Sequence, residues 1–262
     1  MNATGNTILI TGGGSGIGRG LAEAFHKQGN QVIIAGRRQS VLDETTAANP
    51  GMKSLTLNIE DAVAIKSFAA KVVADFPSLN VVINNAGIMK IENLADDSFD
   101  LATAESIVTT NILGPLRLTA ALLPTLRKQP RATIMTVSSG LAFMPLAMTP
   151  TYCATKAAIH SWSQSLRYQL RDTNIEVLEL APPYVQTELT GPRQASDPRA
   201  MPLADYISET VSLIDNPPPS GEILVERVLP LRWAEKNDNF EQIFGNLNGS
   251  FHEDLAAAGS RS

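Results

Sequence analysis

The stretch TGGGSGIG, from Thr11 to Gly18, places five glycines in eight residues near the start of the chain. Glycine loses more conformational freedom on folding than any other residue, so a loop this rich in glycine must need a bare backbone. The stretch follows the apolar run NTILIT (6–11) and opens the helix-like segment GIGRGLAEAFHKQG (16–29). The amino end of a helix offers free N–H groups and a partial positive charge, and it therefore attracts phosphate.

The spacing of these glycines limits what the loop can bind. It reads T-G-x-x-x-G-x-G, which departs from the G-x-G-x-x-G fingerprint of dinucleotide sites, and no G-K-[S/T] follows, which excludes a P-loop. A plain glycine-rich turn is the alternative. In a dinucleotide site, Gly12 would take a tight turn, Gly16 would let the backbone approach a pyrophosphate, and Gly18 would let the helix pack on the strand.

Beyond this loop, short apolar strands alternate with helix-length segments. The strands are rich in Val, Ile and Leu, as expected of strands buried on both faces. The alternation predicts one α/β domain over residues 1–262, a doubly wound (Rossmann) parallel sheet of about seven strands with helices on both faces. We expect strands at 6–11, 31–36, 53–59, 80–87, 131–139, 175–181 and 221–225, and helices at 16–29, 39–48, 61–75, 99–128, 150–172 and 203–214.

Composition restricts the classes of partner and compartment. The 262 residues carry a formal net charge of −5 and no long basic cluster, which argues against a nucleic-acid partner. The single cysteine, Cys153, allows no internal disulfide and favours a reducing compartment. We find no basic-then-apolar leader and no apolar run of about 18 residues, so we expect a cytoplasmic protein without a membrane span. No spacing of His, Cys, Asp or Glu suggests a metal site.

Together with the glycine loop, four further motifs make the chain resemble the short-chain dehydrogenase/reductase family. The loop matches the TGxxxGxG of that family, and NNAG (84–87) matches its motif after the fourth strand. YCATK (152–156) matches its Y-x-x-x-K, Ser139 lies 13 residues before the tyrosine, and Asn111 in TNILGP matches its helix asparagine. Each motif alone is weak, but five in the right order over residues 6–190 are specific.

The tyrosine and the lysine of this set can supply acid–base chemistry. Tyr152 and Lys156 stand at i and i+4, so they share one helix face. A free tyrosine has a pKa of about 10, and a nearby ammonium lowers it toward the range of a proton shuttle. Tyr152 would then be the general acid in reduction and the general base in oxidation. The alternative is a tyrosine and a lysine on a half-exposed helix with no chemical role.

The resemblance implies roles for the other members of the set. Lys156 would also bind the nicotinamide ribose, Ser139 would hold the substrate oxygen, and Asn111 would position a water that links the lysine to solvent. His160 lies one turn beyond Lys156, where it would border this site, although a packed or solvated helix histidine is the simpler interpretation. The predicted catalytic residues are Tyr152, Lys156, Ser139 and Asn111.

The end of the second predicted strand indicates the cofactor. A carboxylate about 20 residues past the glycine loop would bind a ribose 2′-OH and select NAD(H). Ala35 and Gly36 occupy that place, and Arg37 and Arg38 follow directly. Guanidinium groups suit a 2′-phosphate, so the sequence predicts NADP(H), with NAD(H) less favoured. A solvated pair of surface arginines is the alternative.

The remaining cofactor contacts are implied by the resemblance. The Asp-Val that the family carries after strand three is Asn58-Ile59 here, and an asparagine can still meet an adenine edge. Its P-G-x-x-x-T after strand six begins with Pro182-Pro183 and ends with Thr187, so a proline stiffens the turn and removes an N–H. The predicted cofactor-binding residues are Gly12, Ser15, Gly16, Ile17, Gly18, Arg37, Arg38, Asn58, Ile59, Asn85, Ala86, Gly87, Tyr152, Lys156, Pro182 and Thr187.

Two segments bear on the substrate. GLAFMPLAMTPT (140–151) carries no charge and is suited to line an apolar pocket wall or to pack as an ordinary loop. By resemblance, residues 188–215 form the substrate-loop region, which starts with a mobile lid. Together these segments favour an apolar ketone, aldehyde or alcohol, although Arg193 could meet an anion.

Residues 226–262 form a C-terminal extension beyond the point where many relatives end. VERVLPLRWAEKN (225–237) is similar to a bacterial DltE-like branch of the family. An apolar stripe at helical spacing follows, with Asp238 as a candidate N-cap, and it must be buried on this chain or on a second subunit. The family implies a homodimer or homotetramer built on the two long helices. The stripe consists of Phe240, Ile243, Phe244 and Leu247.

These observations predict an NADP(H)-dependent oxidoreductase that interconverts a carbonyl with a secondary or primary alcohol by hydride transfer, with Tyr152 as general acid/base. A non-catalytic NADP(H)-binding sensor or scaffold is the alternative. Such relatives tend to lose the tyrosine or the lysine, and this chain retains all four catalytic positions.

Overall fold

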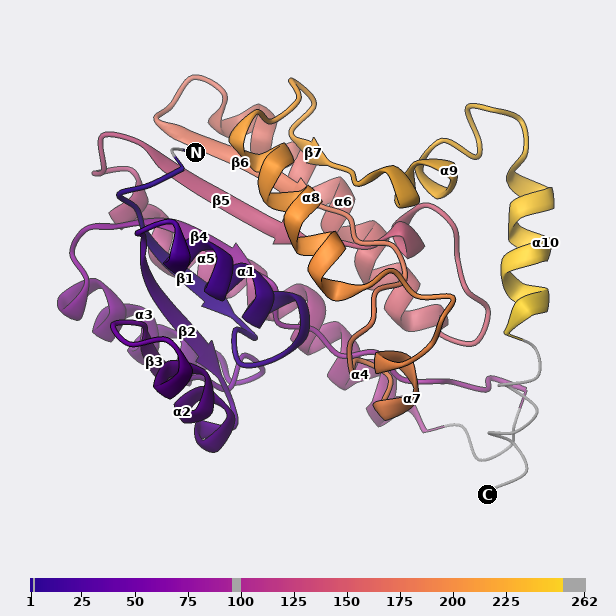
Figure 1. Cartoon of the computed structure of the whole chain (residues 1–262), viewed down its shortest axis with the longest axis horizontal. Coiled ribbons are helices and arrows are strands. Elements are labelled where there is room, and N and C mark those ends of the chain that lie inside the picture. The colour runs from indigo at the N-terminus through magenta and orange to yellow at the C-terminus, as the bar shows by residue number, and fades with distance from the viewer. Residues whose placement is uncertain (2, 96–99, 252–262) are drawn as a thin grey trace.

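The computed structural model describes residue 1, residues 3–95 and residues 100–251. Its centre is a seven-stranded sheet with the order β3-β2-β1-β4-β5-β6-β7, and every neighbouring pair is parallel. Helices cover both faces of the sheet (Figure 1), which confirms the predicted doubly wound fold. The strands are β1 (Thr7–Thr11), β2 (Gln31–Gly36), β3 (Lys53–Thr56), β4 (Leu79–Asn84), β5 (Ala132–Val137), β6 (Ile175–Leu180) and β7 (Glu222–Ile223).

Helices connect these strands and extend the chain beyond the last one. The longest, α6, carries the predicted catalytic tyrosine, and the C-terminal helix α10 stands apart from the sheet (Figure 1). The α-helices are α1 (Gly16–Lys27), α2 (Gln39–Ala48), α3 (Ala62–Asp75), α4 (Leu101–Val108), α5 (Gly114–Leu126), α6 (Pro150–Leu170), α7 (Pro192–Ala195), α8 (Leu203–Asp215), α9 (Leu229–Arg232) and α10 (Phe240–Ser250).

The hydrophobic core has two parts, one on each face of the sheet. Successive side chains of a strand point to opposite faces. Ile8 and Ile10 of β1 therefore share a cluster with Leu21 and Phe25 of α1, whereas Leu9 belongs to a second cluster with residues of α3 and α5. Burial on both faces explains why these strands are almost continuously apolar.

The strand order reverses between β1 and β4, which are hydrogen-bonded neighbours in the sheet. Connections that leave these two strands diverge, and open α/β sheets bind ligands in the crevice that results at the carboxyl ends of the strands. The glycine loop follows β1 and the NNAG segment follows β4. The fold therefore brings both motifs to one place.

Several strands are shorter than predicted. After β4 the backbone N–H groups of Asn85 and Ala86 donate to Thr11 Oγ1, each over 3.1 Å, so the NNAG segment leaves the sheet. The apolar composition continues past the last ladder hydrogen bond, and composition alone therefore misplaces the ends. The strands predicted at 53–59, 80–87, 131–139 and 221–225 end at Thr56, Asn84, Val137 and Ile223.

The helix predicted at 99–128 is interrupted by a π-helical turn at Thr109–Leu113, which separates α4 from α5. Residue 99 lies outside the described residues, and α4 begins at Leu101. The continuous stretch Leu101–Leu126 is long and apolar enough to cross a membrane by length and composition alone. Here it is a core helix, because its side chains Leu118, Leu122 and Leu126 are buried against the sheet and α3.

The C-terminal helix does not start as predicted. Asp238 adopts a positive φ of 55°, and Asn239 is the residue that precedes α10, without a side-chain capping bond. The apolar stripe of α10 is half-buried, and Phe240 stacks on Phe244 with ring centroids 5.8 Å apart. The stripe is therefore covered only in part by its own chain.

Candidate active site

The glycine loop is held in place by the segment after β4. Asn85 Nδ2 donates to the carbonyl oxygens of Thr11 and Gly12 over 2.9 and 3.3 Å. Gly12 has a φ of +67°, which favours glycine, and a Cβ there would lie 2.8 Å from Asn85 Nδ2. A Cβ on Gly18 would lie 2.3 Å from the Gly12 oxygen. Both glycines are thus required by close packing, as predicted from their spacing.

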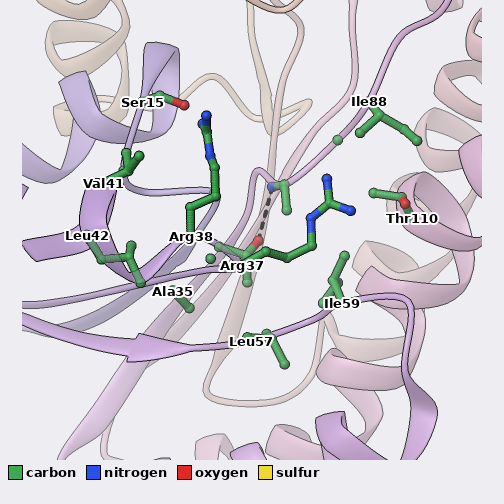
Figure 2. Close-up of a pocket in the computed structure, with 16 residues that line it drawn as sticks. Ser15, Ala35, Arg37, Arg38, Val41, Leu42, Leu57, Ile59, Ile88 and Thr110 are labelled. Atoms are coloured by element: carbon green, nitrogen blue, oxygen red, sulfur yellow. Dashed lines mark hydrogen bonds between the residues drawn. The ribbon is translucent and has the colours of Figure 1, made fainter.

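A pocket opens beside this loop at the switch point, and Figure 2 shows the residues that line it. Its apolar side is formed by Val41, Leu42 and Leu57, and its polar side includes Ser15. A Cβ on Gly14 would come within 3.0 Å of Val41, so a glycine keeps the loop close to this wall. The predicted cofactor-binding residues that line the pocket are Gly12, Ser15, Arg37, Arg38, Ile59, Ala86 and Gly87.

The two arginines after β2 point in different directions. In Figure 2 the guanidinium of Arg38 extends toward Ser15, whereas that of Arg37 extends toward Thr110. Arg37 Nη1 lies 3.6 Å from Glu60 Oε1, and Thr110 Oγ1 donates to the same oxygen over 2.8 Å. Arg37 is therefore partly engaged by a carboxylate, and Arg38 is the arginine on the side of the glycine loop.

Asn58 does not line the pocket. Its side chain is exposed, and its Oδ1 accepts a hydrogen bond from the backbone N–H of Glu60 over 3.2 Å. This short turn leads into α3, where Asp61 caps the helix by accepting from Val63 and Ala64. The neighbouring Ile59 is buried and lines the pocket, so of this predicted pair only Ile59 reaches the cofactor side.

The predicted catalytic residues come together at the carboxyl ends of β4 and β5. Tyr152 and Lys156 are buried on α6, and the Lys156 ammonium lies 5.5 Å from the centroid of the tyrosine ring. Lys156 Nζ donates to the carbonyl oxygen of Val137, the last residue of β5, over 2.7 Å. Ser139 follows two residues later, and its Oγ accepts the N–H of Leu141 over 3.1 Å.

Burial controls the protonation of this pair. Burial raises the pKa of Tyr152, and a hydrogen bond with Ser139 opposes that rise in part. Burial lowers the pKa of Lys156 from 10.5 to about 8, while the charge of Glu179 acts to raise it. At neutral pH the site therefore combines a neutral tyrosine with an ammonium, which suits a proton donor.

Asn111 lies in the π-helical turn and is fully engaged by protein groups. Its Oδ1 accepts the N–H of Ile88 over 2.9 Å, and its Nδ2 donates to Ile88 O over 3.0 Å and to Thr155 Oγ1 over 3.1 Å. A Cβ on Gly87 would lie 3.3 Å from Asn111 Oδ1 and 3.6 Å from Lys156 Nζ. The asparagine side chain thus fixes the NNAG segment beside the lysine, and the water relay implied by resemblance stays a prediction.

The helix that carries Tyr152 is capped by a residue that the sequence analysis missed. Glu92 is buried, and its carboxylate accepts the N–H of Thr151 over 3.1 Å and its hydroxyl over 2.9 Å. A negative charge at a helix amino end is stabilising, and this one orients the first turn of α6. Glu92 lies 60 residues before Tyr152 in the sequence, so no local capping pattern indicated it.

A second missed residue organises the segment after β6. Gln194 is buried on α7, and its Nε2 donates to Val185 O over 2.8 Å and to Thr187 Oγ1 over 3.0 Å. Thr187 in turn lies beside the glycine loop, because a Cβ on Gly16 would be 3.4 Å from its Cγ2. Pro182 O accepts the N–H of Gly140 over 2.8 Å. Gln194 of the predicted lid is thus tied to the segment after β6, and Pro182 of that segment is bonded to the loop that carries Ser139.

The C-terminal extension packs beside Tyr152. Leu247 and Phe251 contact an apolar cluster that includes Tyr152, with Leu141 at its edge. Asn248 Oδ1 accepts the N–H of Ala147 over 2.6 Å, and this bond ties α10 to the loop between Ser139 and Tyr152. Leu146 and Met148 of the loop at 140–151 are buried in this cluster and Leu141 packs against it, as expected of either a pocket wall or an ordinary packed loop. Phe143 instead lies edge-on to His160, with ring centroids 4.8 Å apart.

This chain belongs to the short chain dehydrogenase family, and the family model with that description matches residues 6–198. The matched region includes the glycine loop, the NNAG segment and the Tyr152–Lys156 pair. The protein is therefore an oxidoreductase of this family, as its motifs indicated.

Characterised and uncharacterised relatives agree with this assignment. The chain is 39% identical over 251 residues to the uncharacterized oxidoreductase DltE of Bacillus subtilis (strain 168), which covers 95% of this chain and 98% of that protein. It is 32% identical over 193 residues to dehydrogenase/reductase SDR family member 7B of Bos taurus, which covers 70% of this chain and 59% of that protein. The similarity to DltE supports assignment of this chain to the DltE-like branch of the family.

Solved structures confirm the fold. A short chain dehydrogenase from Burkholderia cenocepacia J2315 in complex with NADP is similar with a TM-score of 0.80 and 20% identity, over 94% of this chain and 99% of that one. A short chain dehydrogenase/reductase from Burkholderia phymatum in complex with NAD has a TM-score of 0.77 and 19% identity, over 92% and 96%. The shared fold thus holds either cofactor, and the choice depends on local residues.

Proposed function

We propose that this oxidoreductase interconverts a carbonyl compound with a secondary or primary alcohol by hydride transfer, uses NADP(H), and employs Tyr152 as general acid/base. The observation that carries this proposal is the buried Tyr152, whose pKa Ser139 influences and which lies close to the Lys156 ammonium at the switch point of the sheet. When bound, the nicotinamide supplies or accepts the hydride.

The chain's own residues supply the rest of the chemistry. In reduction, the hydroxyl of Ser139 donates a hydrogen bond to the carbonyl oxygen and polarises it. Tyr152 donates its proton to the same oxygen as negative charge develops there, and the Lys156 ammonium stabilises the phenolate that is left. Burial favours the neutral tyrosine in the resting site, so the donor is ready before the reaction. Oxidation follows the same steps in reverse.

The residues of the pocket fit NADP(H). Gly12 and Gly87 leave room for a ligand where a Cβ would crowd the site, and Val41 and Leu42 offer an apolar surface for a flat base. Arg38 extends toward Ser15 on the glycine-loop side, where it could pair with a 2′-phosphate. The end of β2 carries no carboxylate that would select a free ribose hydroxyl.

An apolar substrate is the best match to the surroundings of Tyr152. Leu141, Leu247 and Phe251 pack against the apolar cluster around the tyrosine, and the loop at 140–151 carries no charge. A small apolar ketone, aldehyde or secondary alcohol would bury its apolar surface there and expose a single oxygen to Ser139.

We further propose that the protein works as a homodimer or homotetramer in the cytoplasm. Leu101, Val108 and Leu113 on the α4–α5 stretch are exposed, and apolar side chains grouped on a long helix are typical of subunit interfaces. The single cysteine allows no internal disulfide, which suits a reducing compartment. Light scattering coupled to gel filtration measures the assembly directly.

Replacing Tyr152 by phenylalanine tests the mechanism. We expect NADPH-dependent turnover of a panel of apolar ketones and aldehydes to fall by about a hundredfold to ten-thousandfold, because the proton donor is lost. NADPH affinity should stay within about threefold of the wild type, since the pocket is unchanged. Tyr168→Phe is the matched control on the same helix, because Tyr168 is 69% exposed and distant from the site chemistry.

Two outcomes would count against the proposal. Retained turnover in Tyr152→Phe would refute the role of the tyrosine. NADPH binding by a wild-type protein that turns over no carbonyl or alcohol in the panel would favour a cofactor sensor over an enzyme.

A further inference from the structure

Glu179 is an unusual residue for its place in the fold. It lies in β6, which is paired with β5 and β7 in the sheet (Figure 1), and its side chain is 1% exposed. Transfer of an isolated carboxylate from water to a protein interior is strongly unfavourable, so a glutamate here requires partners. No part of the proposed proton transfer uses it directly.

Two side chains hold the carboxylate of Glu179. Ser138 Oγ donates to Oε1 over 2.5 Å, and His160 Nδ1 lies 2.9 and 3.0 Å from the two oxygens. Because an ionised carboxylate only accepts, Nδ1 of His160 carries a proton in this contact. The histidine ring is itself held edge-on by Phe143. The pair is therefore hydrogen bonded and fixed in orientation, with Glu179 buried and His160 17% exposed.

These two partners belong to the elements that carry the catalytic groups. Ser138 lies between Val137, whose carbonyl accepts from Lys156, and Ser139. His160 lies four residues after Lys156, so both side chains share one face of α6. Glu179 thus joins the carboxyl end of β5 to the helix of Tyr152 and Lys156.

Other charged groups lie near Glu179, and its charge also acts on Arg167 and Arg232. Glu222 stands directly opposite Glu179 on β7, and it accepts from Arg232 over 2.7 and 3.1 Å. Arg167 donates to the backbone oxygens of Val177 and Gly221 over 2.9 and 3.3 Å. Glu179 is therefore the carboxylate that His160 contacts, and its charge acts on Lys156 together with these two arginines. The titratable groups around it are Lys156, His160 and Arg167 on α6, Glu222 on β7 and Arg232 on α9.

We propose that the Glu179–His160 pair is a positioning element of the active site, which fixes Ser139 and Lys156 relative to each other and places a negative charge behind the lysine. The inference rests on the proposed function and identifies how this site keeps Lys156 an ammonium although it is buried. A negative charge near a lysine favours its ammonium form, and the charge of Glu179 accordingly raises the pKa of Lys156, whereas burial lowers it.

A purely structural role makes a different prediction. Buried ion pairs contribute little to stability when compared with apolar packing of the same volume, so loss of the pair could change stability without changing the chemistry. The pH dependence of catalysis separates the two, because only a charge that acts on Lys156 moves the alkaline limb of the profile.

Glu179→Gln keeps the shape of the side chain and removes its charge. We expect kcat to fall about tenfold or more and the alkaline limb of kcat/KM to move by about one unit to lower pH, since Lys156 loses its proton more easily. The dissociation constant for NADPH should stay within about threefold of wild type. Glu176→Gln is the matched control, because Glu176 lies on the same strand and its partners are the amino terminus and Thr133.

A second variant covers the case in which Glu179→Gln does not fold. Glu179→Leu combined with His160→Leu replaces the whole pair by apolar groups, a change that buried ion pairs often tolerate. A folded variant should show the same shift of the alkaline limb. A wild-type pH profile and kcat in either folded variant would overturn the inference.

The outcomes for this inference and for the proposed function are distinct. A wild-type protein without turnover of any carbonyl contradicts the proposed function. A wild-type protein with turnover, matched in rate and pH profile by Glu179→Gln, contradicts only the role of the pair.

Discussion

Replacement of Arg38 by alanine is expected to weaken NADPH binding and to leave NADH binding unchanged. A hydrogen bond to a charged group contributes about 1.5–3 kcal/mol, which corresponds to about a tenfold to hundredfold loss of affinity. Arg38 extends toward Ser15 beside the glycine loop, whereas Arg37 lies 3.6 Å from the carboxylate of Glu60. Arg37→Ala should therefore weaken NADPH binding less, by about threefold, because part of its charge is already neutralised.

The measurement is a fluorescence titration of each variant with NADPH and with NADH, using Trp162 and Trp233 as the reporters. NADH is the internal control, since it lacks the 2′-phosphate and shares every other contact. The reasoning is refuted if Arg38→Ala weakens both cofactors equally, or if Arg37→Ala has the larger effect on NADPH. A wild-type preference for NADH would reject the selection of NADP(H) while leaving the hydride-transfer proposal intact.

Three further outcomes are expected. The rate of carbonyl reduction should reach its maximum below about pH 8 and fall as pH rises through that value. Burial lowers the pKa of Lys156 to about 8, and only the ammonium form of Lys156 stabilises the phenolate. A stopped assay over a pH series measures this dependence. Gly18→Ala should lower the unfolding free energy by about 1–3 kcal/mol in denaturant titration, because its Cβ would lie 2.3 Å from the Gly12 oxygen. Phe251→Ala should raise KM for a bulky apolar ketone about tenfold, since Phe251 contacts the Tyr152 cluster. Phe240→Ala on the same extension is the control and should change KM little. Equal effects of the two substitutions would contradict a role for Phe251 in substrate binding.

Much of the fold could be predicted because its signals are local. Apolar strands that alternate with helix-length segments predict a parallel sheet, and all seven predicted strands are present in it. The glycine loop and the YCATK segment could also be recognised in the sequence, since each motif occupies about one turn of backbone. The π-helical turn at Thr109–Leu113 was not predicted, because no break in composition marks it.

The contacts that hold the candidate-site residues in place could be identified only in the tertiary structure. Asn85 holds the glycine loop from 67 residues beyond Gly18, and Glu92 caps the helix of Tyr152 from a separate segment. Gln194 was invisible in the sequence, because a polar residue in a loop is ordinarily exposed. The apolar stripe of α10 could be recognised, but its position beside Tyr152 could not.

The sequence by itself determined the family and the sheet and predicted the candidate catalytic set, because these depend on residue type, spacing and periodicity along the chain. Only the tertiary structure decided that Arg37 faces Glu60 while Arg38 faces the glycine loop, and that Glu179 pairs with His160 on the helix of Lys156. The reason is physical. The charge state of a buried group depends on which distant side chains share its low-dielectric surroundings, and the order of residues along the chain does not specify those neighbours.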